Sequence, residues 1–114
     1  MESRYPFRVN IEQHGALRVL KLQGELDLAS CVMLEEELGH IDDARAIVVD
    51  LSQLEFIDSS GIGLLVRAND DAEAKHSSFA LINGSGQVRQ LLELTGLAAR
   101  LTISDTLAEL QIEY

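Results

Sequence analysis

The segment AIVVDLS at residues 46–52 is the feature that most restricts how this chain can fold. It is short, mostly apolar and rich in β-branched side chains, which is typical of a strand buried on both faces of a sheet. Such a strand needs helices to cover it. An apolar helical face follows soon after it, formed by Ile62, Leu65, Val66, Asn69 and Ala72. We therefore expect an α/β protein built around a central sheet.

Strand patterns recur before and after this segment. FRVNI at residues 7–11 alternates apolar and polar residues, and ALRVLKLQG at 16–24 follows closely enough to pair with it as an antiparallel hairpin. SSFALIN at 77–83 and LTIS at 101–104 indicate two further strands. With a single proline at position 6 and no linker, nothing divides the chain, so we expect one domain over residues 1–114.

Three more helices are expected between and after these strands. The first is capped by Asp27 and has an apolar face made of Cys31, Leu34, Leu38 and Ile41. The next is marked by Val88, Leu91, Leu92 and Thr95 and ends at Gly96. A closing helix would contain Leu107 and Leu110 and begin at Ser104 or Asp105. The predicted order is β-β-α-β-α-β-α-β-α, a mixed central β-sheet covered by about four α-helices.

Net charge and cysteine content restrict the kinds of partner and the cellular compartment that suit this chain. Nine Lys and Arg against 19 Asp and Glu give a net charge of −10, which disfavours direct contact with nucleic acid or an anionic membrane. A protein partner with a basic face is more compatible. The one cysteine, Cys31, falls in an apolar pattern and is expected to be a small buried side chain. Without a signal peptide or a run of about 20 apolar residues, a cytoplasmic protein is expected.

The segment FIDSSGIG at 56–63 is the candidate site, because it places two hydroxyls between a strand and a helix. A serine nucleophile would need Gly before the Ser and a well-placed His, and this segment has Ile57-Asp58-Ser59 instead. The glycines match neither a dinucleotide-binding nor a P-loop pattern. A phosphorelay receiver would use Asp50, but the acidic pair and the late lysine are missing. Three scattered His and one Cys suggest no metal site, and we expect no cofactor.

Two interpretations of the segment remain. In the first, Asp58, Ser59 or Ser60 simply caps the following helix, which is the plainer explanation from local chemistry. Alternatively, a serine at the helix start is a phosphorylation site, because the free N–H groups and partial positive charge there tolerate a phosphate. The glycines Gly61 and Gly63 would let the helix approach the sheet, while Gly84 and Gly86 would form a turn.

Three segments of the chain together resemble the anti-sigma-factor antagonists, the small stand-alone STAS-domain proteins of bacteria. These are GELDLAS at 24–30, VVDLSQLEFIDSSGIGLLVRA at 48–68 and VRQLLELTGL at 88–97, in the order and spacing of that family. The resemblance implies a regulatory binding protein that is not an enzyme. Such a protein binds an anti-sigma-factor serine kinase and thereby releases a sigma factor, is switched off by phosphorylation, and is restored by a PP2C-type phosphatase.

Carried over by position, the resemblance makes Ser59 the phosphorylated residue. The implied partner-binding surface comprises Glu25, Asp27, Asp58, Ser59, Ser60, Gly61, Ile62 and Arg67. STAS domains also occur in lipid-transport machinery and large stress-sensing assemblies. The resemblance therefore leaves open an alternative, a STAS interaction subunit in which the serine is not a switch.

Overall fold

The computed structural model describes residues 6–110 of the chain. Within them lie five strands, three α-helices and two short 3₁₀ helices. In chain order they are β1 (Arg8–His14), β2 (Leu17–Leu26), α1 (Leu28–Gly39), β3 (Ala46–Ile57), α2 (Ser59–Ala74), β4 (Ser78–Ile82), α3 (Gly86–Leu94), η1 (Leu97–Ala99), β5 (Thr102–Ser104) and η2 (Leu107–Glu109).

The strands form one mixed sheet in the order β1-β2-β3-β4-β5. β1 and β2 are an antiparallel hairpin, as predicted, and every other neighbouring pair is parallel. β3 is therefore the central strand, and its first residues are buried on both faces, also as predicted. Because parallel strands all end at the same edge, the carboxyl ends of β2 and β3 meet there, with Leu26 opposite Ile57.

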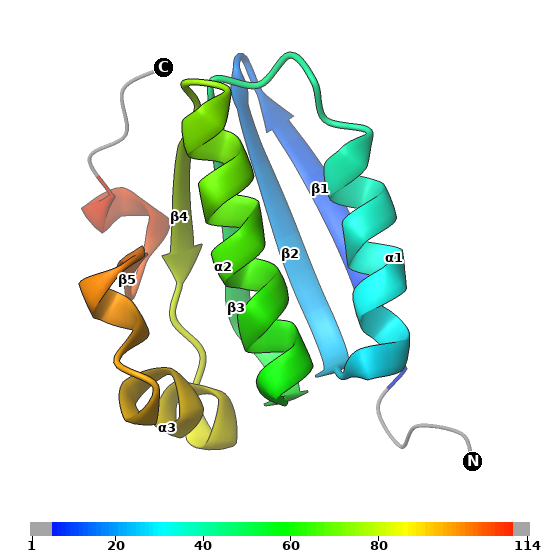
Figure 1. Cartoon of the computed structure of the whole chain (residues 1–114), viewed down its shortest axis with the longest axis vertical. Coiled ribbons are helices and arrows are strands. Elements are labelled where there is room, and N and C mark those ends of the chain that lie inside the picture. Colours follow the sequence, from blue (N-terminus) through cyan, green and yellow to red (C-terminus); the bar gives the residue numbers. More distant parts are fainter. Residues whose placement is uncertain (1–5, 111–114) are drawn as a thin grey trace.

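The helices α1 and α2 lie side by side over one face of this sheet, with α3 beside its lower end (Figure 1). The larger core fills the space beneath them and includes Leu20, Leu34, Val49 and Leu65, none of which is exposed. A smaller apolar cluster occupies the opposite face, where Leu110 packs against it. The sequence pattern of the central strand thus matches a sheet with an apolar cluster on each side.

The closing segment differs from the prediction of about four α-helices. Within the described residues it forms only the 3₁₀ helix η2, capped by the hydroxyl of Thr106 rather than by Ser104 or Asp105. Residues 111–114, where the predicted helix would have continued, lie outside the described part. The spacing of Leu107 and Leu110 predicted a helix that is absent from the described residues. Leu110 instead packs against the apolar cluster on the sheet.

Candidate functional site

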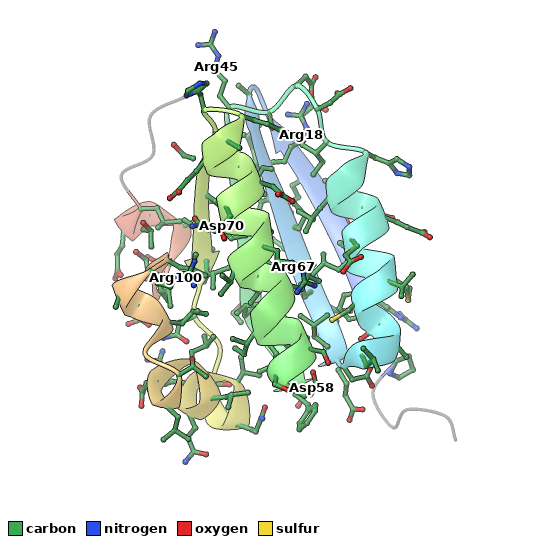
Figure 2. All side chains as sticks on the ribbon, viewed as in Figure 1. Arg18, Arg45, Asp58, Arg67, Asp70 and Arg100 are labelled. Carbon is green, nitrogen blue, oxygen red and sulfur yellow. The ribbon has the colours of Figure 1, made fainter. Side chains whose placement is uncertain are left out.

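The DSSG segment forms the junction between β3 and α2 at the carboxyl edge of the sheet. Asp58 has an extended backbone, and α2 begins at Ser59. The Asp58 carboxylate caps the helix, because its Oδ1 accepts hydrogen bonds from the N–H of Ser60 at 2.9 Å and of Gly61 at 3.2 Å. Figure 2 shows Asp58 at the lower end of α2, far from Arg18 and Arg45 at the opposite end of the molecule.

Hydrogen bonds from two other elements fix this junction in place. On one side, the N–H of Asp58 donates to the carbonyl of Leu26 at the end of β2 (3.2 Å). On the other, the side-chain amide of Gln87 in α3 binds the N–H and the carbonyl of Ile57 at 3.0 and 2.7 Å. The start of α2 is therefore attached to both neighbouring segments. Sequence analysis gave no indication of the role of Gln87.

Gly61 allows the first turn of α2 to press against the sheet. A Cβ placed there would lie 2.6 Å from Cγ1 of Ile57 and 3.1 Å from Cδ2 of Leu26, two core side chains with no exposure. The predicted close approach is thus confirmed for Gly61. It is wrong for Gly63, where an added Cβ would meet only the end of the Arg67 side chain. Gly84, expected in a turn, also packs closely, against Val88.

The two hydroxyls of the segment have different surroundings. Ser59, the first residue of α2, is exposed, whereas Ser60 is half-buried. The N–H groups of Ser60 and Gly61 donate to Asp58, and neither serine hydroxyl has a partner in the described structure, so the two differ in exposure alone. A helix N-terminus favours negative charge through its dipole. Geometry alone therefore ranks Ser59 above Ser60 for reaction with an external group, a choice that the residues by themselves left open.

The start of α1 lies beside the start of α2 and is also closed by a carboxylate. Asp27 and Ser30 form a reciprocal capping box, with the Asp27 side chain accepting from the Ser30 N–H at 3.0 Å. This backbone hydrogen bond is the main reason that the pKa of Asp27 is below its usual value. The Ser30 hydroxyl also donates to the carbonyl of Glu25 at 2.7 Å. Asp27 and Glu25 thus join Asp58 at the same edge of the sheet.

Cys31 occupies the interior of this corner. It is buried, as predicted, with 6% of its surface exposed. Burial raises the pKa of its thiol, and the nearby carboxylate of Asp58 acts in the same direction. Both effects keep the thiol neutral, so Cys31 contributes packing rather than a nucleophile to the site.

The remaining predicted residues lie further along α2. Ile62 is half-buried and packs against the core, so only part of it is available to a partner. Arg67 lies two turns beyond Ser59 and points toward α1, where it pairs with Glu35 at 3.3 Å (Figure 2). Both members of that pair are more than half exposed, at 62% and 53%. The structure thus brings together seven of the eight predicted residues at this edge of the sheet, with Gly61 buried among them, and leaves Arg67 further along α2.

Exposed apolar side chains near this corner were missed by the sequence analysis. Leu28 and Val32 are 73% and 58% exposed in the first two turns of α1, and Phe56, two residues before Asp58, is 37% exposed. Leu28 and Val32 lie outside the buried face of α1, so a helical-wheel projection of all residues of that helix would have identified them. Leu28 and Val32 are one helical turn apart on the same face of α1, so they expose adjoining apolar surface that could serve as an interaction site.

A large groove of the described structure lies elsewhere. It measures about 1130 Å³ and runs between α1 and α2 toward the opposite end of the helices, with Ile47 and Phe79 among its lining residues. Its lining includes Glu35 and Arg67 but neither Asp58 nor Ser59. Within residues 6–110, no three metal-ligating side chains gather, and no helix has the length and apolar composition needed to cross a bilayer.

Comparison with known proteins gives consistent matches. The model of the STAS domain matches residues 8–110. The anti-sigma-F factor antagonist RsfB of Mycobacterium tuberculosis is 31% identical over 101 residues, covering 87% of this chain and 82% of that protein. A crystal structure of an anti-sigma factor antagonist from Mycobacterium paratuberculosis superposes with a TM-score of 0.82 at 28% identity, covering 91% and 90% of the two chains.

SpoIIAA, another anti-sigma factor antagonist, extends this comparison. Its unphosphorylated form has a TM-score of 0.75 and 25% identity, over 90% of this chain and 91% of SpoIIAA. The phosphorylated form, described for Bacillus, has a TM-score of 0.69 at 24% identity over 90% and 95% of the chains, a likeness of fold.

The mixed five-stranded sheet with its three α-helices is that of a single STAS domain. The chain belongs to the STAS-domain family and, within it, to the anti-sigma-factor antagonists. Proteins of this class are regulators that act by binding, not enzymes.

Proposed function

We propose that this chain binds an anti-sigma factor that is itself a serine kinase and thereby releases a sigma factor in the cytoplasm. In the proposed cycle, the kinase phosphorylates Ser59, the modified protein no longer binds, and a PP2C-type phosphatase restores it. The observation that carries the proposal is the exposed Ser59 hydroxyl, which has no partner in the described structure and stands at the start of α2 beside the exposed Leu28 and Val32.

The electrostatics of the junction suit a switch that changes binding without unfolding the protein. A phosphate adds a charge of about −1.5 to −2, which the positive end of the α2 dipole can accommodate. Asp58 and Asp27 already place negative charge at the same edge. The added phosphate would therefore concentrate negative charge beside Asp58 and Asp27, and would make burial of the neighbouring apolar side chains against a partner costly. The fold would survive because Gln87 and Leu26 hold the junction through hydrogen bonds that do not involve Ser59.

The experiment that tests this proposal is peptide-resolved mass spectrometry of the protein from its native cells, with and without stress. Phosphate on Ser59 that changes with condition, and that disappears in a Ser59→Ala strain but persists in a Ser60→Ala strain, is the expected result. An unmodified Ser59 under every condition would contradict the switch. That outcome would favour instead a STAS subunit that binds its partners constitutively in a lipid-transport or stress-sensing assembly.

A further inference from the structure

The outer edge of β1 is the longer of the two edges of the sheet. β1 runs over seven residues, Arg8–His14, and among residues 6–110 it pairs only with β2. The opposite edge, β5, has three residues. A free strand edge presents a row of backbone N–H and C=O groups to which another strand can pair.

The hairpin turn determines which of these groups point outward. Two residues, Gly15 and Ala16, join β1 to β2, with Gly15 at φ +60° and His14 opposite Leu17. In a two-residue hairpin the flanking residues form a hydrogen-bonded pair, and such pairs alternate along the ladder. Even-numbered residues of β1 therefore bond to β2. The N–H and C=O groups of Val9 and Ile11 point away from the sheet.

We propose that this edge pairs with β1 of a second copy of the chain, antiparallel, with Asn10 on the twofold axis. In this register the Arg8 of each copy faces the Glu12 of the other. Each Glu12 already pairs with Lys21 at 3.0 Å and His14 at 3.2 Å in its own copy, so each of the two new ion pairs with Arg8 would extend an exposed charge cluster on one face. On the other face, Val9 of each copy meets Ile11 of the other. Centring the axis on Ile11 would instead place Arg8 against His14 and lose both ion pairs. The sequence of β1 is thus self-complementary in one register, both in charge and in apolarity.

Exposed apolar side chains on the helix side of β1 support the same interface. Ile11 is 38% exposed, although Leu20, its neighbour in β2, is fully buried. Met33 is 49% exposed on α1, and its position two residues before Glu35 places it on the side of the helix facing away from α2. Because α1 lies over the β1 side of the sheet, this side of α1 faces the same outer edge of the molecule as β1 (Figure 1). Pairing of the two edges would remove part of this apolar surface from water.

The expected dimer is weak and leaves the Ser59 surface open. A pair of seven-residue edges buries a small interface, which is typical of transient complexes. Two chains that each carry a net charge of −10 also repel one another, although salt limits that repulsion to about 8 Å at physiological ionic strength. The dimer interface would lie along the β1 edge, whereas Ser59 follows the central strand β3. The dimer is therefore independent of the proposed phosphorylation switch.

Sedimentation equilibrium of the whole chain, over a concentration series reaching the near-millimolar range, tests the dimer. We expect reversible dimerisation that Arg8→Glu weakens about tenfold or more, because like charges would then face one another twice. Arg45→Glu is the matched control, since it makes the same change in net charge at an exposed residue that points away from the end of the sheet (Figure 2). The double variant Arg8→Glu, Glu12→Arg should recover dimerisation. A chain that stays monomeric throughout, or equal effects of the two single variants, would overturn the proposal.

A covalent test does not depend on those charges. In a Cys31→Ala background, Asn10→Cys would place two thiols on the twofold axis with Cα atoms about 4.5 Å apart, within reach of a disulfide. Gln13→Cys, also exposed on β1, would place its thiols about 20 Å apart in the same register. Rapid oxidation to a covalent dimer for Asn10→Cys, but not for Gln13→Cys, is the expected result. Equal crosslinking of the two variants would exclude the register.

Discussion

The side-chain amide of Gln87 hydrogen-bonds to both backbone polar groups of Ile57, accepting from its N–H at 3.0 Å and donating to its carbonyl at 2.7 Å. The two residues are 30 positions apart and belong to α3 and β3. Ile57 directly precedes Asp58, the cap of α2. One side chain of α3 therefore completes the hydrogen bonding of the central strand at the point where the candidate switch begins.

Removing this amide should destabilise the protein without abolishing the fold. Each hydrogen bond contributes about 0.5–1.5 kcal/mol net, and water can partly replace the lost partners at this accessible position. We expect Gln87→Ala to lower the free energy of unfolding by about 1–2 kcal/mol in urea denaturation. Gln90→Ala, an exposed glutamine of the same helix without a side-chain partner in the described structure, should change it by less than about 0.5 kcal/mol. Equal effects of the two variants would refute this role.

A methyl group at Gly61 should disturb the packing of α2 on the sheet. Its Cβ would lie 2.6 Å from Cγ1 of Ile57, a core atom with no free space around it, so either the helix or the strand must shift. Overpacking of this kind costs about 1–3 kcal/mol. Gly39→Ala is the control, because nothing lies within 4 Å of an added Cβ there, and the same substitution should be neutral or slightly stabilising. Thermal melts of both variants would decide the matter, and a Gly61→Ala variant as stable as Gly39→Ala would contradict the packing argument.

Local patterns predicted the parts of this fold that local forces determine. The apolar spacing of Cys31, Leu34 and Leu38 predicted α1, and the apolar run at 46–52 predicted the central strand. The pattern predicted a strand over residues 46–52, but β3 continues to Ile57. Its ladder with β2 has register shifts, and Asp50 accepts locally from the N–H of Ser52 at 2.9 Å. An irregular strand interrupts the periodicity on which a sequence prediction relies.

The parts that sequence could not predict depend on contacts between distant segments. Nothing near Gln87 indicates that its amide reaches Ile57, because the contact exists only once α3 lies against β3. The different exposure of Ser59 and Ser60 likewise arises from how α2 sits on the sheet. The close approach at Gly61 was predictable, because a glycine at the start of a helix that follows a buried strand has no Cβ to keep the helix away from the sheet.

Acid should reduce the contribution of Asp27 to stability. Hydrogen bonds in the capping box keep the pKa of Asp27 below its usual value, so this carboxylate stabilises the fold fully above its unfolded pKa of about 3.9. That stabilisation is lost as pH falls through the lower, folded pKa. Asp27→Asn retains a capping side chain that does not titrate. We expect the wild-type protein to be more stable than Asp27→Asn at pH 7, and the difference to shrink below about pH 4. A difference independent of pH in urea titrations would disprove the linkage.

The exposed leucine at the start of α1 should matter for binding and not for folding. Leu28 is 73% exposed, so Leu28→Ala should change the free energy of unfolding by less than about 0.5 kcal/mol. If Leu28 packs into the partner, the same variant should weaken binding about tenfold or more. The control is Leu94→Ala, since Leu94 is 83% exposed at the far end of α3. Calorimetry with the anti-sigma factor that the tagged wild-type protein captures from its native cells gives both affinities. Indistinguishable affinities of the two variants would remove Leu28 from the interface.

Substitutions at Ser59 separate the charge of the proposed switch from its hydroxyl. Ser59→Asp adds negative charge at the exposed first residue of α2, where the dipole favours it, so the melting temperature should be equal to or above that of the wild type. The same charge should abolish binding to the captured anti-sigma factor. Ser59→Ala should bind as the wild type does and take up no phosphate from the kinase with labelled ATP. Ser60→Asp adds the same charge at the next residue, which is half-buried, and should weaken binding less than Ser59→Asp. Undiminished affinity of Ser59→Asp, or label retained by Ser59→Ala, would show that Ser59 is not the switch.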